Sequence, residues 1–412
     1  MNKAKRQLLP LTGMRFFLAL WVVLFHQSFF YGPSWISPLP NSIVDLIHAG
    51  YMAVGMFFVL SGFVLSYNYN LDNLWPQGQI KRFAFARFAR IYPAYGIGLI
   101  LSLPWVVTSM AHQPIVAAGR ELIRAVLSWT LLQAWVPWAA ESWNGPGWSL
   151  SVEAFFYCCF PFVGVALWKL SRPRHILSVS ATIWAASIVV PAIAFAVPFT
   201  DGGGIRASLW TSDTTGLRVS FAKFNPLLHL PEFCMGILIG RAYLLLLVRE
   251  TRLLGKGYWI YLPGIAFEIL AVISCRSSLY LFLHNGLLLP LHAMVVLGLA
   301  LDGGILARFC SIGPLVLLGN ASYSMYIFQA PVAGYVFSLG KRMSSLQSSG
   351  ILMNSLYIAI LICFSTLIFK FIEDPANRIL KKKLMPSFQS STSHERDALV
   401  PPAKAAPLRA PV

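Results

Sequence analysis

Long apolar blocks separated by short polar segments fill most of this chain. Within the blocks apolar residues follow one another without the apolar–polar alternation of a β-strand, and each block holds about 18 residues or more. A helix of about 20 residues crosses the hydrocarbon core of a bilayer and satisfies its own backbone hydrogen bonds there. The pattern predicts helices near residues 11–31, 49–69, 90–111, 122–139, 148–168, 176–198, 226–248, 258–275, 279–301, 314–338 and 351–372.

Composition supports the membrane class. Of the 412 residues, 57% are hydrophobic and only 11% are charged, which is more apolar than a soluble protein of this length. A short basic N-terminus leads into a long apolar block, which indicates an uncleaved first span and not a signal peptide. Most of the six cysteines lie in apolar segments without the paired spacing of zinc sites, so we expect no metal site and no disulfide framework.

The basic residues indicate which blocks cross the membrane. The net charge of +17 fits a membrane protein whose Lys and Arg gather in cytoplasmic loops, and we do not expect a nucleic-acid partner. The basic groups at 81–90 and 169–174 both fall on the inner side only if the block at 122–139 does not cross. That block is short, carries Arg124, and has tryptophans in and after it, as an interfacial segment does.

These arguments predict an all-α polytopic integral membrane protein in a lipid bilayer. Removing the block at 122–139 leaves about ten spans with both termini cytoplasmic, and it places 122–147 at the outer surface. Residues 1–383 form one membrane domain. Residues 384–412, rich in Ser, Pro and Ala, form a disordered cytoplasmic tail.

Two ionisable residues stand out in the first span. Arg15 and His26 are eleven residues apart, which puts them on one helix face about 16 Å apart along the axis. An arginine near a helix end can extend to the headgroups, and a histidine can serve as a structural hydrogen-bonding group. Intramembrane ionisable residues otherwise face a bundle interior or a water-filled cavity, where a neutral imidazole is a competent general base.

Further charged residues lie near the ends of other spans. Arg87 and Arg90 are three residues apart at the inner end of the third span, where they either anchor the helix or form a fork for phosphate groups. Glu153 follows the helix-breaking "NGPG" at the outer side of the fifth span. It either compensates the helix dipole or meets His26 and orients its imidazole. Glu268 lies within a span and has no evident partner.

The order of these motifs resembles acyltransferase family 3, a family of integral membrane acyltransferases that includes bacterial acetylases of surface polysaccharides. The resemblance extends from Leu11 to about Lys383 and is carried by Arg15 and His26 followed, in order, by "FFVLSG", "RFARIYP", "WSLSVE", "LPEFCMGILIG" and "NASYSMYIFQAP". Such proteins usually have ten spans and transfer an acyl group, commonly acetyl from acetyl-CoA, to a hydroxyl of a carbohydrate or similar acceptor.

The resemblance implies roles for individual residues. His26 would be the catalytic histidine, Arg15 its companion, and Glu153 the acid of the fifth span. Arg87 and Arg90, with Arg15, would bind the phosphates of the acyl donor. Substrate-binding roles fall to Asn320, Tyr323 and Trp148, the first two as oxyanion donors. The chain departs from the family pattern at Ala154, where a second acid is frequent, and at Gln329, where a histidine is frequent.

The resulting hypothesis is an acyl-CoA-dependent O-acetyltransferase of the bacterial inner membrane, with a carbohydrate or glycolipid acceptor and no metal. His26 would take the acceptor proton directly or carry the acyl group transiently. Two alternatives stay open: a proton-coupled transporter or flippase, which would use intramembrane His and Glu as a relay, and a non-catalytic membrane scaffold. The sequence shows no paired repeats of the kind many transporters have.

Overall fold

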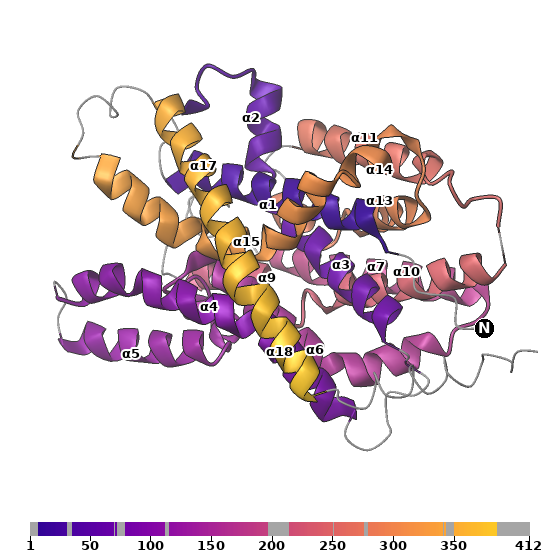
Figure 1. The fold of residues 1–412 in the computed structure, drawn as a ribbon, viewed down its shortest axis with the longest axis horizontal. Helices are drawn as coiled ribbons and strands as arrows, with labels where there is room; N and C mark the ends of the chain where they lie inside the picture. Colours follow the sequence, from indigo (N-terminus) through magenta and orange to yellow (C-terminus); the bar gives the residue numbers. More distant parts are fainter. Residues whose placement is uncertain are drawn as a thin grey trace, which may run out of the picture.

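The structure, a computed structural model, describes residues 7–30, 35–69, 71, 79–111, 115–196, 214–249, 251–275, 279–340, 342 and 350–384. Within these ranges the chain forms helices and connecting turns, and no described residue lies in a strand. This confirms the all-α class (Figure 1). The tail assigned to 384–412 lies outside the described residues beyond Leu384.

The elements of the described residues follow one another along the chain. They are α1 Leu9–Phe30, α2 Asn41–His48, α3 Met52–Asn68, α4 Gln79–Ala111, α5 Ile115–Trp129, the 3₁₀ turns η3 Gln133–Trp135, η4 Pro137–Ala139 and η5 Gly145–Gly147, α6 Trp148–Trp168, α7 Pro173–Ala196, α9 Thr214–Phe224, α10 Leu230–Val248, α11 Tyr258–Cys275, α12 Tyr280–His284, α13 Leu289–Leu301, α14 Gly304–Cys310, α15 Gly313–Gly340, α17 Gly350–Ile368, the π-helix η6 Phe369–Glu373 and α18 Asp374–Leu384.

The helices confirm a polytopic membrane protein. In the described part of the chain, seven helices are long and apolar enough to cross a bilayer, and the number rises to nine if two bent pairs each count as one span. The bent pairs are α2 with α3, at 46°, and α14 with α15, at 68°. The one remaining predicted span, 258–275, corresponds to the shorter apolar helix Tyr258–Ser274. The count of ten and the orientation of the termini stay predictions.

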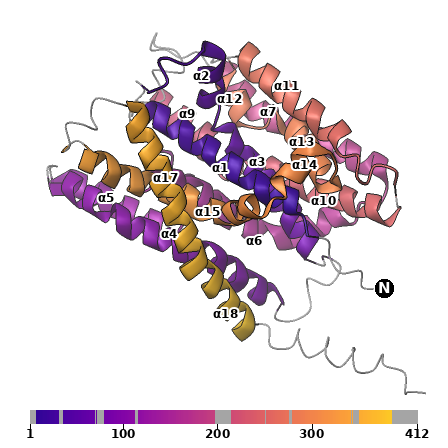
Figure 2. The same cartoon turned by 45° about the horizontal axis from the view of Figure 1, so that its top comes forward.

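Glycines allow the central helices to approach closely. A Cβ placed on Gly62 of α3 would lie 2.1 Å from the backbone oxygen of Phe233, and one on Gly236 of α10 would lie 2.1 Å from that of Val59. A Cβ on Gly319 of α15 would likewise lie 1.9 Å from the oxygen of Thr12 on α1. Small residues at such crossings bring helix backbones together in membrane proteins. α1 and α15 therefore lie side by side, as Figure 2 shows.

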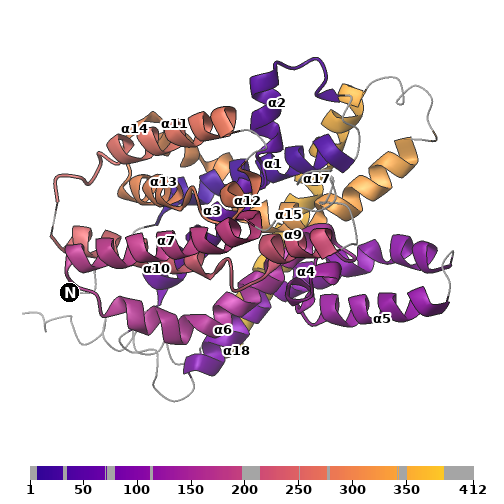
Figure 3. The same cartoon turned by 180° about the vertical axis from the view of Figure 1, so that it is seen from behind.

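The segment predicted at the outer surface divides into the end of α5 and a chain that packs against the bundle. α5 packs against α4 in a hairpin that extends from the main body (Figure 3) and, as expected, is not among the helices able to cross. The chain that follows it is partly buried, with Gln133 and Asn144 each 1% exposed. Asn144 Nδ2 donates to the carbonyl of Ile327 at 2.9 Å, and Gln133 Nε2 donates to the carbonyl of Gly147 at 2.8 Å.

The second half of 122–147 therefore packs against the protein, and its position at the outer surface stays a prediction. Tryptophans and short length correctly indicate a segment that does not cross, but polar side chains inside that segment hydrogen-bond within the protein instead of facing headgroups. As a result α6 begins inside the bundle, at Trp148, beside the middle of α4, where Gln133 Nε2 also donates to the Tyr95 hydroxyl at 3.0 Å.

Candidate active site

His26 and Gln329 form the hydrogen bond at the centre of the site. Nδ1 of His26, on α1, lies 2.9 Å from Oε1 of Gln329, on α15. The amide of Gln329 is oriented by its Nε2, which donates to the carbonyl of Tyr326 at 2.8 Å. Its Oε1 is therefore an acceptor, and Nδ1 of His26 carries the proton. In the neutral ring this leaves Nε2 as the nitrogen that can accept a proton.

Packing holds Gln329 in this position. Its side chain is buried at 2% exposure, and the hydroxyl of Tyr357 on α17 donates to its backbone oxygen at 3.0 Å. His26 itself keeps intermediate exposure, although protein surrounds its ring. An acceptor that is itself held in place on one ring nitrogen is a condition under which an imidazole serves as a base.

We expected Glu153 to lie beside Nδ1 of His26, but Gln329 occupies that position. Oε1 of Glu153 instead accepts hydrogen bonds from the hydroxyls of Tyr157 and, at 3.3 Å, Ser61. The expectation placed the start of α6 at the outer surface. Because α6 begins inside the bundle, Glu153 reaches the level of the arginines on α4.

The three arginines expected to bind donor phosphates lie in one region. Arg15 lies within electrostatic range of Arg90 and of Glu153, and protein surrounds it although its side chain is only half-buried. The guanidinium of Arg87 lies 5.6 Å from the ring centre of Tyr69 and 5.9 Å from that of Tyr157. The arrangement concentrates positive charge inside the bundle, which suits an anionic ligand.

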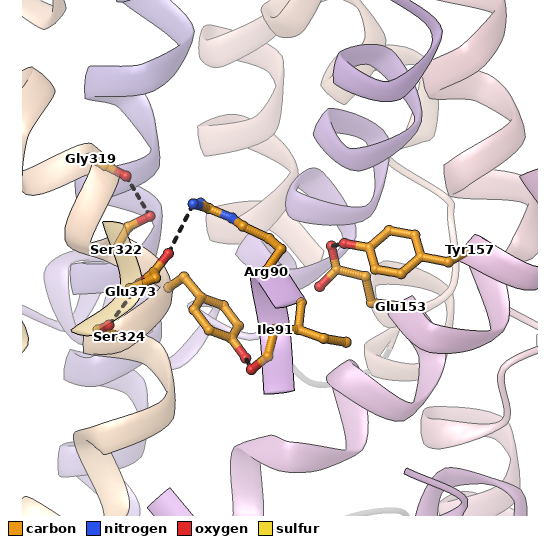
Figure 4. Close-up of polar contacts among 9 residues, drawn as sticks. Arg90, Ile91, Glu153, Tyr157, Gly319, Ser322, Ser324 and Glu373 are labelled. Atoms are coloured by element: carbon orange, nitrogen blue, oxygen red, sulfur yellow. Dashed lines mark hydrogen bonds and ion pairs between the residues drawn. The ribbon is translucent and has the colours of Figure 1, made fainter. Parts of the chain in front are cut away.

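The sequence analysis missed Glu373, which belongs to this arginine group. Its Oε1 lies 2.9 Å from Nη1 of Arg90, and its Oε2 accepts a hydrogen bond of 2.9 Å from Ser324 (Figure 4). The available signal was an acid directly after the last apolar block, before Pro375. An acid at that place also suits the first turn of a surface helix, so the sequence alone did not separate the two.

The proposed substrate-binding residues are not equally placed to contact a ligand. Asn320 is half-buried on α15, near the inner part of α1. The hydroxyl of Tyr323 donates to the carbonyl of Ile91 at 2.5 Å, so its single donor is already engaged. Trp148 is 6% exposed and packs against Phe58, with ring centres 6.2 Å apart. Its other ring neighbours are Phe224, His229 and His284, and these ring contacts do not reach His26 or the arginines.

A second group of ionisable residues lies on α10, α11 and α13. Nδ1 of His229 lies 2.8 Å from Oε2 of Glu232, and Nε2 of His292 lies 3.7 Å from Oε1 of Glu268. Glu268, which had no partner in the sequence analysis, thus faces a histidine. Among the described residues, no group of three or more His, Cys, Asp or Glu is arranged to hold a metal ion.

The candidate site thus combines a histidine whose Nδ1 is held by an acceptor with three arginines gathered in another region of the same helical bundle. In the comparison with known families, the profile described as "Acyltransferase domain" matches residues 10–372. The chain belongs to acyltransferase family 3 and is a multi-pass membrane protein.

Individual relatives are distant but cover most of the chain. It is 28% identical to the acyltransferase MdmB of Streptomyces mycarofaciens over 395 residues, 90% of this chain and 92% of that protein. It is 24% identical over 408 residues to the peptidoglycan O-acetyltransferase OatA of Listeria monocytogenes, and 22% over 346 residues to the O-acetyltransferase OatA of Staphylococcus aureus.

The matches to the OatA proteins cover 92% and 81% of this chain but only 57% and 52% of those proteins. The chain therefore spans just over half the length of these relatives. No solved structure is significantly similar to the fold.

Proposed function

We propose that this protein is a membrane O-acyltransferase of the bacterial inner membrane that moves an acyl group, acetyl in the first instance, from acyl-CoA to a carbohydrate hydroxyl. The observation that carries the proposal is the hydrogen bond from Nδ1 of His26 to Gln329, which makes Nε2 the basic nitrogen of a neutral ring. The relatives include O-acetyltransferases, one of them acting on peptidoglycan, so a polysaccharide or lipid-linked glycan is the acceptor class proposed for this chain.

The chemistry needs one base and no net proton uptake. Nε2 of His26 takes the proton of the acceptor hydroxyl as its oxygen attacks the thioester carbonyl. The new C–O bond forms, the C–S bond breaks, and the imidazolium returns the proton to the departing thiolate of CoA. Gln329 favours the competent tautomer throughout, because its Oε1 accepts the Nδ1 proton in both the neutral and the charged ring.

The donor would enter on the side of the arginines. CoA carries several phosphate groups, and Arg87, Arg90 and Arg15 offer guanidinium groups to bind them. Arg15 and His26 lie on one face of α1 about 16 Å apart along its axis. The extended pantetheine arm of CoA would cover that separation and present the thioester to His26.

The test is thiol release from acetyl-CoA by purified protein in nanodiscs, with and without an extract of membrane glycolipids. We expect release that depends on the extract and falls at least about 100-fold in His26→Ala, the lower range of general-base catalysis. A folded wild-type protein that releases no thiol from any acyl-CoA would overturn the proposal and favour transport. Unchanged release in His26→Ala would exclude this residue as the base.

A further inference from the structure

Glu373 is a buried carboxylate that the proposed reaction does not use directly. It ends the π-helix η6, between α17 and α18, and only 2% of its surface is exposed. Burial of a carboxylate is unfavourable unless charged or hydrogen-bonding groups compensate it. Single π-turns inserted into α-helices are frequent at functional sites. The partners of this carboxylate therefore indicate its role.

Two other helices supply those partners. Nη1 of Arg90, on α4, lies 2.9 Å from Oε1, and the hydroxyl of Ser324, on α15, donates to Oε2 at 2.9 Å. Figure 4 shows Glu373 between Arg90 and Ser324, with Glu153 and Tyr157 on the other side of Arg90. Because Ser324 fixes the carboxylate, Arg90 is paired with an anion that is itself held in place.

The two ends of this ion pair differ in exposure. The side chain of Arg90 is 28% exposed, whereas that of Glu373 is 1% exposed. A guanidinium has five N–H donors, and pairing through Nη1 leaves donors for a phosphate. Glu373 is thus a buried carboxylate that orients a partly exposed guanidinium. An ion pair that blocked ligand binding would instead leave the guanidinium fully buried.

Glu373 also balances the charge of a second arginine. Arg15 lies within electrostatic range of both Arg90 and Glu373. Two guanidinium groups repel each other inside a protein, where the dielectric constant is lower than in water. A carboxylate in range of both offsets that repulsion and allows them to remain close before a ligand binds.

We infer that Glu373 is a positioning residue for the acyl donor. Through Arg90 and Arg15 it holds two guanidinium groups in the arrangement that binds the phosphate groups of acyl-CoA. The inference rests on the proposed function, since it assumes acyl-CoA as the donor. It differs from a purely structural role because its effect must depend on the phosphates of the ligand.

The experiment compares Glu373→Gln with wild type in nanodiscs, using two donors. Acetyl-CoA carries the phosphates, and S-acetylpantetheine has the same thioester arm without them. Glutamine keeps the size of glutamate and one acceptor oxygen but removes its charge and replaces the second acceptor by an N–H donor. We expect KM for acetyl-CoA to rise about tenfold, the effect of losing one charge-assisted hydrogen bond, with kcat little changed. KM for S-acetylpantetheine should be unchanged.

The neighbouring acid provides a matched control. Asp374 pairs with Arg378 at 2.7 Å, but this pair is at the surface, with side-chain exposures of 79% for Arg378 and 34% for Asp374. Asp374→Asn should therefore have the KM and kcat of wild type with both donors, because exposed ion pairs contribute little to stability. Unfolding midpoints of both variants in the same nanodiscs show whether Glu373→Gln is folded.

The outcomes separate the two proposals. A fall in KM for acetyl-CoA in Glu373→Gln would mean that the carboxylate competes with the donor, and it would overturn the inference. Equal losses with both donors would assign Glu373 a structural role and would also overturn it. Wild-type protein that releases no thiol from acetyl-CoA would instead reject the proposed function itself, and this inference with it.

Discussion

At the residue scale, the amide oxygen of Gln329 favours one tautomer of His26. Gln329→Leu keeps most of the side-chain volume but removes this side-chain acceptor of the Nδ1 proton, which weakens the preference for the tautomer with a basic Nε2. We expect kcat for thiol release to fall by about 10- to 100-fold, the effect of removing a group that orients a functional histidine. KM for acetyl-CoA should stay within about twofold, because Gln329 lies away from the arginine group.

Gln329→His is the conservative comparison for this prediction, since an imidazole nitrogen can also accept the Nδ1 proton of His26. It should retain more activity than Gln329→Leu, with unfolding midpoints of the two variants compared to exclude misfolding. Equal activity of Gln329→Leu and wild type would show that the hydrogen bond does not control the base.

Sequence reasoning selected His26 and Arg15 as candidates but not the residues that contact them or Arg90. His26 and Arg15 were recognisable because lipid excludes charged groups from spans without a function. Gln329 is 303 residues from His26, and only the packing of α1 on α15 brings the two together. Glu373 was not predicted for the same reason. Its partner Arg90 lies on another helix, and a single sequence does not reveal that contact.

At the element scale, the crossing of α3 and α10 depends on glycine. Replacing Gly62 or Gly236 by alanine would put a methyl group 2.1 Å from a backbone oxygen of the partner helix, so the helices must separate. We expect each variant to lose about 1–3 kcal/mol of stability, the range for overpacking. Heat or SDS titration of the purified protein would measure this loss.

Gly96 on α4 is the matched control, because a Cβ there would have no atom within 4 Å. Gly96→Ala should be neutral or stabilising by up to about 1 kcal/mol, the helix-propensity gain of alanine over glycine. If Gly62→Ala proved as stable as Gly96→Ala, the close approach of α3 and α10 would be wrong.

The elements were easier to predict than their placement. Apolar blocks of bilayer length located the spanning helices, because the requirement for internal hydrogen bonds leaves few other structures in lipid. Hydropathy did not reveal that the chain after α5 folds back into the bundle. That depends on specific acceptors for Gln133 and Asn144, supplied by Gly147 and Ile327. The position of Glu153 was mispredicted as a consequence.

At the scale of the whole molecule, a basic residue of α10 contacts the end of α6 and the residue that follows it. Arg241 on α10 donates through Nε to the carbonyl of Leu170, directly after α6, at 3.1 Å, and its guanidinium lies 4.8 Å from the ring centre of Trp168. Charge alone predicts that the basic group at 169–174 and Arg241 both lie on the cytoplasmic side. Their contact makes those two assignments depend on each other, since one end of a bundle cannot lie on both sides of the bilayer.

The orientation can be tested with single cysteines in a variant that lacks the six native ones, two of which, Cys158 and Cys363, are exposed. Arg172→Cys follows α6 at an exposed position, and Arg120→Cys is exposed on α5. Because Lys and Arg of short loops stay in the cytoplasm, a membrane-impermeant maleimide should label position 120 in intact cells and position 172 only after permeabilisation. The reverse pattern would invert the molecule and place the arginine group on the side that lacks acyl-CoA.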